Sequence, residues 1–409
     1  MLIVERVNGK IRHIEAKKEF LMTFQNKPKH SFIRKSENGH VEVTTEELFF
    51  DLIYVFLVTQ ISHGLLHHLG PIGFLQTLVL WFAAWLGWQY TGWVTNWFDP
   101  RSAALRCVLF ASMALALLCG AAAPEAFGAR GLSFAICYTM MQVGRSAFVV
   151  ARLPANHALL PNYKRILVWN MISGACWIAG AFYPAHERLA FWSAAVLCEY
   201  ISPMFGFWLP FLGRSHTSDW TISGSHLVER CQLFVMVALG ETIMASGLSM
   251  ARAAQWTTPT LSGFFTSFLC TIAMWWLYFG TSTKQAEHAI KHSSDPGRLG
   301  AYFHYIHAVL IAGIIVTAVG MDILLENPLE IVTGPALFAM ISGPLLYLVG
   351  SLVYQRIVTA QWPMPQMGGI VGFIILLCLG QTQSALVLCC MGTLLLLSVA
   401  WCVERNHKA

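Results

Sequence analysis

The chain has 409 residues, of which 56% are hydrophobic and only 11% are charged. Soluble globular domains carry roughly 25% charged residues, so this composition excludes an ordinary soluble enzyme or binding module. The formal net charge of +5 comes from cations spread over many loops, so no nucleic-acid partner is expected. Apolar runs of about 20 residues recur along the chain, which predicts an all-α, polytopic integral membrane protein surrounded by membrane lipids.

The first 44 residues form an arm that is rich in Lys and Arg. It contains no apolar segment of the kind found in signal peptides. We expect a cytoplasmic tail that sets the topology of the chain. A short helix lying on anionic lipid is the alternative.

Turn-forming residues divide the rest of the chain into apolar segments, which we predict to be about twelve transmembrane helices. The segments are 46–69, 72–98, 102–123, 130–152, 164–183, 188–212, 226–249, 258–283, 299–322, 331–355, 366–381 and 384–403. With this count, Lys and Arg concentrate in the loops on the side of the N-terminus. The positive-inside rule then places both termini in the cytoplasm.

A faint internal repeat is visible in the sequence. Glu47 and Thr59 in the first segment have the same spacing as Glu229 and Glu241 in the seventh, and the second and eighth segments share the pattern W-x-Y-x-G. An even number of spans in each unit would make the two six-helix copies parallel. The predicted organisation is a basic arm (1–44), a first unit with its following loop (45–225) and a second unit with a short tail (226–409).

The first segment, TEELFFDLIYVFLVTQISHGLLHHLG, carries Glu47 and Asp51 on one helix face. A charged side chain at the bilayer centre costs about 2.5–3.5 kcal/mol on insertion scales, so it normally has a partner. Arg145, Glu229 and Arg230 lie at a similar depth in their own segments. We therefore expect Asp51 to pair with Arg145, and Arg230 to pair with Glu47 or Glu229. A purely structural ion-pair network is the alternative to a functional site.

Two further carboxyl groups, Glu199 and Glu241, lie near the middle of their segments. Glu241 is about 16 Å from Arg230 along the helix axis, so the two cannot pair directly. Glu241 therefore needs water, a proton or another helix, which suits a proton relay. A protonated carboxyl group bonded to a facing helix is the alternative.

Two histidines of the ninth segment and several residues near the predicted membrane boundary are further candidates for a site. His304 and His307 share a face, but no Asp or Glu lies beside them at ligand spacing, so we predict neither a metal site nor a cofactor. Proton handling or polar packing is the expected role of the two histidines. Residues expected to line a vestibule with them are Trp93, Asn96, Trp97, Asp99 and Asp219.

Several segments, in this order, resemble the low temperature requirement A (LtrA) family of bacterial membrane proteins: EELFFDLIYVFLVTQISHGLL, YTGWVTNWFDP, MQVGR, GRSHTSDWTISGSHLVERCQLFVMVALGETI and YFHYIHAVLIAGII. The resemblance covers roughly residues 42–400. It implies a protein of the bacterial inner (plasma) membrane, linked by the family name to growth in the cold, but it implies no particular reaction. The family pattern falls on Glu47, Phe50, Asp51, Asp99, Arg145, Asp219, Glu229, Arg230, Gly240 and Glu241.

These features together predict a secondary transporter or ion-coupled permease for a small solute or ion. Asp51, Glu241 and Glu199 would bind protons or cations, while Arg145 and Arg230 would pair with them or hold an anionic group. Three alternatives stay open: an ion channel, a membrane enzyme acting on a lipid at the cytoplasmic face, and a structural or sensory protein. A homo-oligomer is compatible with each of them.

Overall fold

The computed structural model describes residues 32–34, 41–216, 220, 222–280, 290, 293 and 295–408. Within these ranges the chain is helical apart from its connections, and it forms no β-strand. The expected all-α class is therefore confirmed for the part of the chain that the structure describes.

Ten helices in the described ranges are long and apolar enough to cross a membrane, which agrees with a polytopic membrane protein. They are α2 (Thr45–His67), α3 (Pro71–Trp97), α4 (Ala103–Ala122), α5 (Gly131–Arg152), α8 (Gly224–Arg252), α9 (Thr258–Phe279), α11 (Pro296–Glu326), α12 (Gly334–Thr359), α13 (Met364–Leu379) and α14 (Ala385–Lys408). The structure describes two further long helices, α6 (Leu160–Ala181) and α7 (Ala185–Met204), which are more polar than these ten. Each segment expected from the sequence corresponds to one of these helices, but the count of twelve spans stays a prediction.

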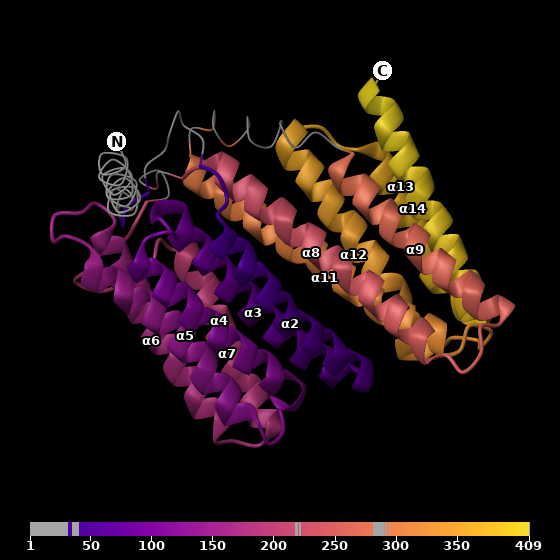
Figure 1. Ribbon diagram of the computed structural model, residues 1–409, viewed down its shortest axis with the longest axis horizontal. Coiled ribbons are helices and arrows are strands. Elements are labelled where there is room, and N and C mark those ends of the chain that lie inside the picture. Colours follow the sequence, from indigo (N-terminus) through magenta and orange to yellow (C-terminus); the bar gives the residue numbers. More distant parts are fainter. Residues whose placement is uncertain are drawn as a thin grey trace, which may run out of the picture.

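The helices form two bundles that follow each other along the chain (Figure 1). In the N-terminal bundle, α2 packs against α3 and α4, contacts continue from α4 through α5 and α6 to α7, and α7 returns to α3. In the C-terminal bundle, α8 packs against α9 and α11, contacts continue through α12 and α13 to α14, and α14 returns to α9. Each bundle is therefore a closed ring of six described helices, with the same order of neighbours.

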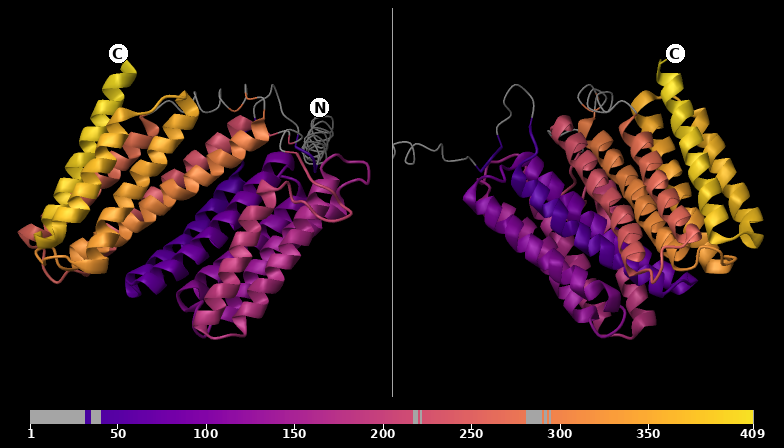
Figure 2. Two further views of the ribbon diagram at one scale, coloured as in Figure 1. Left: turned by 180° about the vertical axis from the view of Figure 1, so that it is seen from behind. Right: turned by 45° about the vertical axis from the view of Figure 1, so that its right-hand side comes forward.

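The two bundles meet through α2 and α3 on one side and α8 and α11 on the other (Figure 2). We call this contact the bundle interface. The helix α2 begins, and α14 ends, at the same end of the molecule (Figure 1), which we call the near side. The opposite end is the far side.

The helix α2 shows why the interface is polar. It buries Glu47, Asp51 and Ser62, whereas Phe49 and Leu52 on its opposite face are 48% and 59% exposed. Apolar side chains can face lipid without cost, while charged groups must face protein or water. The polar face of α2 is therefore turned toward the second bundle.

Glycines allow the closest helix contact of the C-terminal bundle, between α11 and α12. A Cβ atom added to Gly313 would lie 2.5 Å from the backbone nitrogen of Tyr347, and one added to Gly343 would overlap the backbone nitrogen of Thr317. Small residues let membrane helices approach until their backbones touch. The helix α11 thus packs closely against α12 on one side and lies at the bundle interface on the other.

Candidate functional site

Glu47, in the first turn of α2, is fully buried at the near side of the bundle interface. The backbone N–H of Thr44 donates to its Oε2 atom at 2.9 Å, which helps to cap the helix. Three basic side chains surround the carboxylate. His226 Nε2 and Arg230 Nη1 lie 2.7 and 3.4 Å from Oε1, and Arg34 Nη1 lies 3.4 Å from Oε2. Glu47 thus joins the N-terminal arm, α2 and α8.

Asp51 lies one turn deeper in α2 and is also fully buried. Arg230 Nη2 and Trp88 Nε1 donate to its Oδ1 atom at 2.6 and 2.7 Å, and the guanidinium of Arg230 lies 5.5 Å from the centre of the Trp88 ring. The expected pair between Asp51 and Arg145 is wrong, because Arg230 of α8 occupies that place. The ion pair that forms crosses the bundle interface.

His226 is held in one tautomer by the residues around it. The amide of Asn96 accepts from the backbone N–H of Ser223 and donates to the carbonyl oxygen of the same residue, each at 3.0 Å. Its NH₂ group therefore faces His226 Nδ1, at 3.0 Å. We assign an acceptor at Nδ1 and a donor at Nε2, directed at Glu47. The end of α3 is thereby fixed to the start of α8.

Nothing in the sequence pointed to Arg34 as part of the site, because the expectation for the arm is a cytoplasmic tail or, alternatively, a short helix on anionic lipid. Its side chain is 4% exposed and donates to the carbonyl oxygen of Thr95 at 2.5 Å, beside Glu47. Phe32 stacks on Phe98 at the end of α3, with the ring centres 4.7 Å apart. Burial lowers the pKa of Arg34 below its ordinary value, while the charge of Glu47 acts in the opposite direction. The end of the arm is thus part of the cluster.

Glu229, in contrast, does not pair with Arg230 as one of the expected alternatives proposed. Its Oε2 atom accepts a hydrogen bond from the backbone N–H of Val43 at 3.2 Å. It therefore holds the segment that leads into α2. Arg230 is directed at Glu47 and Asp51 instead.

Two more carboxyl groups lie toward the far side of α8 and α11. Glu241 is 7% exposed and accepts from Thr59 Oγ1 of α2 at 2.5 Å, again across the bundle interface. Asp322 of α11 accepts from Ser249 Oγ of α8 at 2.8 Å. Neither carboxyl group has an ion-pair partner among the described residues. Such groups are suited to bind a proton or a cation.

Three aromatic rings separate these two polar levels, and we call them the aromatic layer. Trp88 stacks on Phe234 with the ring centres 4.7 Å apart, and it packs against Trp85 at 4.9 Å. Phe234 lies between Arg230 and Glu241 on α8. The polar groups on the two sides of the aromatic layer therefore do not touch.

The interior of the N-terminal bundle holds a separate polar chain. Glu199 of α7 accepts from Tyr138 of α5 at 2.7 Å and from Trp177 of α6 at 3.1 Å. The Tyr138 hydroxyl accepts from Gln142 Nε2 at 3.0 Å, and Gln142 Oε1 accepts from Arg145. Arg145 has no ion-pair partner in the described part of the chain.

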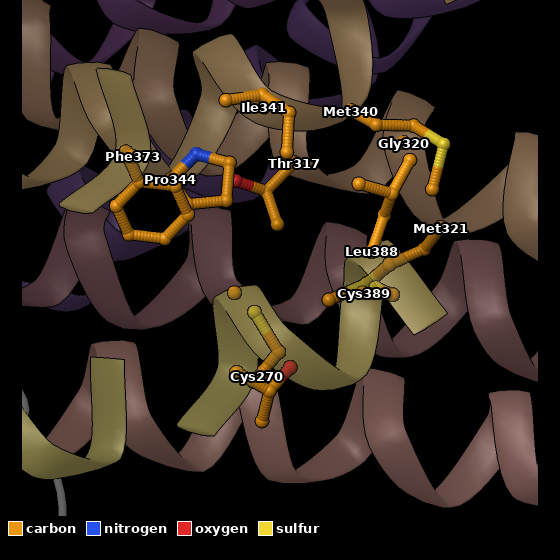
Figure 3. Close-up of a pocket in the computed structure, with 12 residues that line it drawn as sticks. Cys270, Thr317, Gly320, Met321, Met340, Ile341, Pro344, Phe373, Leu388 and Cys389 are labelled. Carbon is orange, nitrogen blue, oxygen red and sulfur yellow. The ribbon is translucent and has the colours of Figure 1, made fainter. Parts of the chain in front are cut away.

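The interior of the C-terminal bundle is different. Its cavity of about 20 Å³ is lined by apolar residues and two threonines, with no charged group (Figure 3). Such a space is large enough for about one water molecule. The ionisable residues that are candidates for function therefore lie in the N-terminal bundle and at the bundle interface.

The residues expected to form a vestibule gather at the near end of α3, but they are packed rather than open. Trp93 and Trp97 are 7% and 8% exposed, and both contact the ring of Trp220. Asn96 binds His226, as described above, and Asp99 Oδ1 accepts from Arg101 at 3.1 Å. Asp219 lies outside the described residues.

The two histidines of α11 have different surroundings. His307 Nε2 lies 2.7 Å from the Tyr278 hydroxyl and its Nδ1 lies 2.7 Å from the carbonyl oxygen of Phe303, so both ring nitrogens are satisfied. His304 packs against Trp88 and Trp93, and its Nδ1 atom has no hydrogen-bond partner among the described residues. His304 therefore belongs to the interface site, and His307 to the packing around it.

The chain was compared with known proteins. Residues 42–403 match the family described as bacterial low temperature requirement A protein (LtrA). An uncharacterised protein of Rhizobium meliloti (strain 1021) is 35% identical over 343 residues, which cover 83% of each chain. No solved structure matches the chain. The family expected from the sequence motifs is thereby confirmed: the chain belongs to the bacterial low temperature requirement A family.

Proposed function

We propose that this protein is a proton-coupled secondary transporter whose two bundles move against each other. The observation that carries the proposal is the position of its buried charges. The ion pair between Asp51 and Arg230 and the hydrogen bond between Thr59 and Glu241 both join one bundle to the other. Buried charges within membrane segments commonly mark the path of a substrate or a proton.

The arrangement of the bundles supports relative movement. The order of neighbouring helices is the same in both, which fits two parallel copies related by an axis along the membrane normal. Carriers built from such copies expose a site alternately by moving one copy against the other. We infer that α2 and α3 correspond to α8 and α9, as the shared sequence patterns suggest.

The two ends of the bundle interface differ in their chemistry. At the near side, Glu47, His226, Arg230 and Arg34 form a continuous network. At the far side, Leu65 of α2 packs in an apolar cluster with α11 and α12, beside an apolar groove of about 290 Å³. We propose that the ion pairs act as a cytoplasmic gate and that the aromatic layer separates them from Glu241.

Within this scheme, Glu241 is a proton site at the bundle interface and Asp51 is the gate carboxylate. Glu241 forms no ion pair among the described residues. The Thr59 hydroxyl donates to it, and His63 lies one turn further along α2. Protonation of Glu241 would change that hydrogen bond across the bundle interface. Asp51 would exchange Arg230 for a proton or a cation when the bundles separate.

The test is a flux measurement on proteoliposomes that contain an internal pH dye and carry an imposed proton or alkali-cation gradient. Wild type is compared with Glu241→Gln and Asp51→Asn, and with Glu187→Gln as a matched control, because Glu187 is exposed at the start of α7. We expect flux in the wild type and the control, and its loss in the two variants. If both variants, correctly folded, transport like the wild type, the proposal is rejected.

The same preparation separates a carrier from a channel. A carrier moves its ion in a fixed ratio to a solute, whereas a channel conducts down the voltage with no solute. A current that follows the voltage and is lost in Asp51→Asn would support the channel instead.

Location and physiology belong to the same proposal. We propose the bacterial inner membrane, with the near side in the cytoplasm, because the basic arm and most basic loops lie on that side of the predicted topology. The family name links the protein to growth at low temperature. Growth of a deletion strain in the cold, restored by the wild type but not by Glu241→Gln, would connect transport with that phenotype.

A further inference from the structure

The polar chain inside the N-terminal bundle has a fixed direction. An arginine can only donate, so Gln142 must turn its carbonyl oxygen toward Arg145 and its NH₂ group toward Tyr138. The Tyr138 hydroxyl accepts that bond and gives its own hydrogen to Glu199. Three hydrogen bonds thus run head to tail from a guanidinium to a carboxylate.

Glu199 and Arg145 balance each other's charge through this chain. They are 4% and 3% exposed, and no other Asp, Glu, Lys or Arg forms an ion pair with either of them in the described part of the bundle. The titratable groups that interact with the pair from the surrounding helices are hydroxyls and a thiol: Tyr54 of α2, Tyr90 of α3, Tyr138 of α5, Tyr163 of α6, and Cys198 and Tyr200 of α7.

This balance has a consequence for binding. A proton on Glu199 would leave Arg145 as an uncompensated cation inside the bundle. An isolated buried charge is unfavourable. An oxyanion beside the guanidinium would restore neutrality, and the planar fork of arginine matches a carboxylate or a tetrahedral oxyanion.

A second, unused hydrogen-bond donor lies beside Arg145. The Tyr54 hydroxyl has no hydrogen-bond partner among the described residues, although the side chain is only 1% exposed. It lies against Gly87, where an added Cβ atom would overlap it. The carbonyl oxygen of Gly87 accepts from Arg145 at 3.1 Å, and Thr91 Oγ1 accepts at 2.9 Å. Tyr54 and Arg145 therefore meet at one short stretch of α3.

A pocket of about 310 Å³ opens at the far side of the N-terminal bundle, and neither Tyr54 nor Arg145 is among the residues that line it. It is bounded by α2, α3, the turn η1 (Ala123–Glu125) and the start of α7, and His68, Gln76 and Glu125 are among its polar residues. Leu80 lies at its inner end. Two residues further along α3, the carbonyl oxygen of Phe82 accepts from Tyr200, which follows Glu199, at 3.2 Å. Leu80 lies seven residues before Gly87, which is about 10 Å along the axis of α3.

From these observations we propose that the N-terminal bundle binds one oxyanion at Arg145 and Tyr54 together with one proton at Glu199. Within the proposed transport function, this makes the solute an anion that moves with a proton. The binding itself does not depend on transport. By linkage, the proton strengthens anion binding and the anion strengthens proton binding by the same factor.

The test is isothermal titration calorimetry on the full-length protein in detergent. The probes are sodium formate, a carboxylate, and sodium sulfate, a tetrahedral oxyanion that does not titrate near neutral pH. Each titration is made in two buffers of different ionisation enthalpy, so that the heat reports proton uptake as well as affinity. We expect one of the probes to bind with uptake of about one proton.

Four variants assign the effect to residues. We expect Arg145→Gln to weaken binding about tenfold or more, and Tyr54→Phe to weaken it less, since it removes a single neutral hydrogen bond. Glu199→Gln should keep the anion site but lose the proton uptake. Arg165→Gln is the matched control, because Arg165 binds the Leu212 carbonyl and Ser215 elsewhere in the bundle.

Three results would overturn the inference: no proton-linked binding of either probe, unchanged binding in Arg145→Gln, or proton uptake that persists in Glu199→Gln. Tyr54→Phe keeps the shape of the side chain, so it remains informative if Arg145→Gln does not fold. Binding in detergent without flux in proteoliposomes would remove the transport proposal and leave this site. Flux without proton-linked anion binding would remove this site and leave the transport proposal.

Discussion

Asp51 and Arg230 are 179 residues apart in the sequence, yet Arg230 Nη2 lies 2.6 Å from Asp51 Oδ1. Both side chains are at most 2% exposed. Trp88 donates to the same carboxylate oxygen and also lies under the guanidinium. The two bundles are therefore held together at the near side by the buried ion pairs of Arg230 with Asp51 and with Glu47, the first of which is built around an indole ring.

We expect Asp51→Asn and Arg230→Gln each to destabilise the protein. Asp51→Asn leaves Arg230 with Glu47 alone, 3.4 Å away, and Arg230→Gln leaves Asp51 without a cation among the described residues. Removing one member of a buried ion pair typically costs about 3–5 kcal/mol. The double variant should lose less than the sum, with a coupling energy of about 0.5–3 kcal/mol, measured by unfolding in denaturing detergent. The control is Glu46 with Arg106, a partly exposed pair whose coupling should stay below about 1 kcal/mol. Equal coupling energies in the two cycles would contradict this account of the buried pair.

Arg34→Gln should also lower the free energy of unfolding, although Arg34 lies outside the long helices. It removes a charged donor from Glu47 and from the Thr95 carbonyl, and hydrogen bonds to charged groups are worth about 1.5–3 kcal/mol. Arg152→Gln is the control, since among the described residues Arg152 forms no ion pair and lies 5.9 Å from the ring of Phe32. An Arg34→Gln protein as stable as this control would show that the arm does not hold the cluster.

The hydrogen bonds on the two sides of the His226 ring predict that two substitutions of this residue differ in stability. Glutamine can still donate to Glu47 and accept from Asn96, whereas leucine can do neither. We expect His226→Leu to be less stable than His226→Gln by about 1–3 kcal/mol, the cost of an unsatisfied buried polar group. Thermal unfolding in one detergent compares them directly, and the reverse order would show that the hydrogen bonds of His226 do not stabilise the protein.

Gly343→Ala should destabilise the contact between α11 and α12, because the new methyl group would overlap the backbone of Thr317. Overpacking of this kind costs about 1–3 kcal/mol. The control is Gly247→Ala in α8, where a Cβ atom meets no neighbouring atom within 4 Å. That variant should be unchanged or slightly more stable, because alanine favours the helix. If both variants lost a similar amount of stability, Gly343 would not be needed for the close approach of α11 and α12.

The sequence was informative where the signal is local. Apolar runs and the Pro and Gly residues between them placed a helix at 46–69, where the structure has Thr45–His67, and another at 226–249, where it has Gly224–Arg252. The LtrA motifs identified the family, and the buried carboxyl groups were identified because charge is rare in such runs. Helix depth alone, however, could not select the partner of Asp51. Arg145 and Arg230 lie at similar depths, and only the order of neighbouring helices separates them.

By itself, then, the sequence determined a polytopic helical protein of the LtrA family with charged residues inside its helices. The tertiary structure decided which of these charges meet. It placed Arg230 on Asp51, brought Arg34 and His226 to Glu47, and joined Glu199 to Arg145 through Tyr138 and Gln142. The reason is physical: hydropathy and helix ends depend on neighbouring residues in the chain. A buried charge is satisfied instead by whatever polar atoms the packing of distant helices brings within about 3 Å.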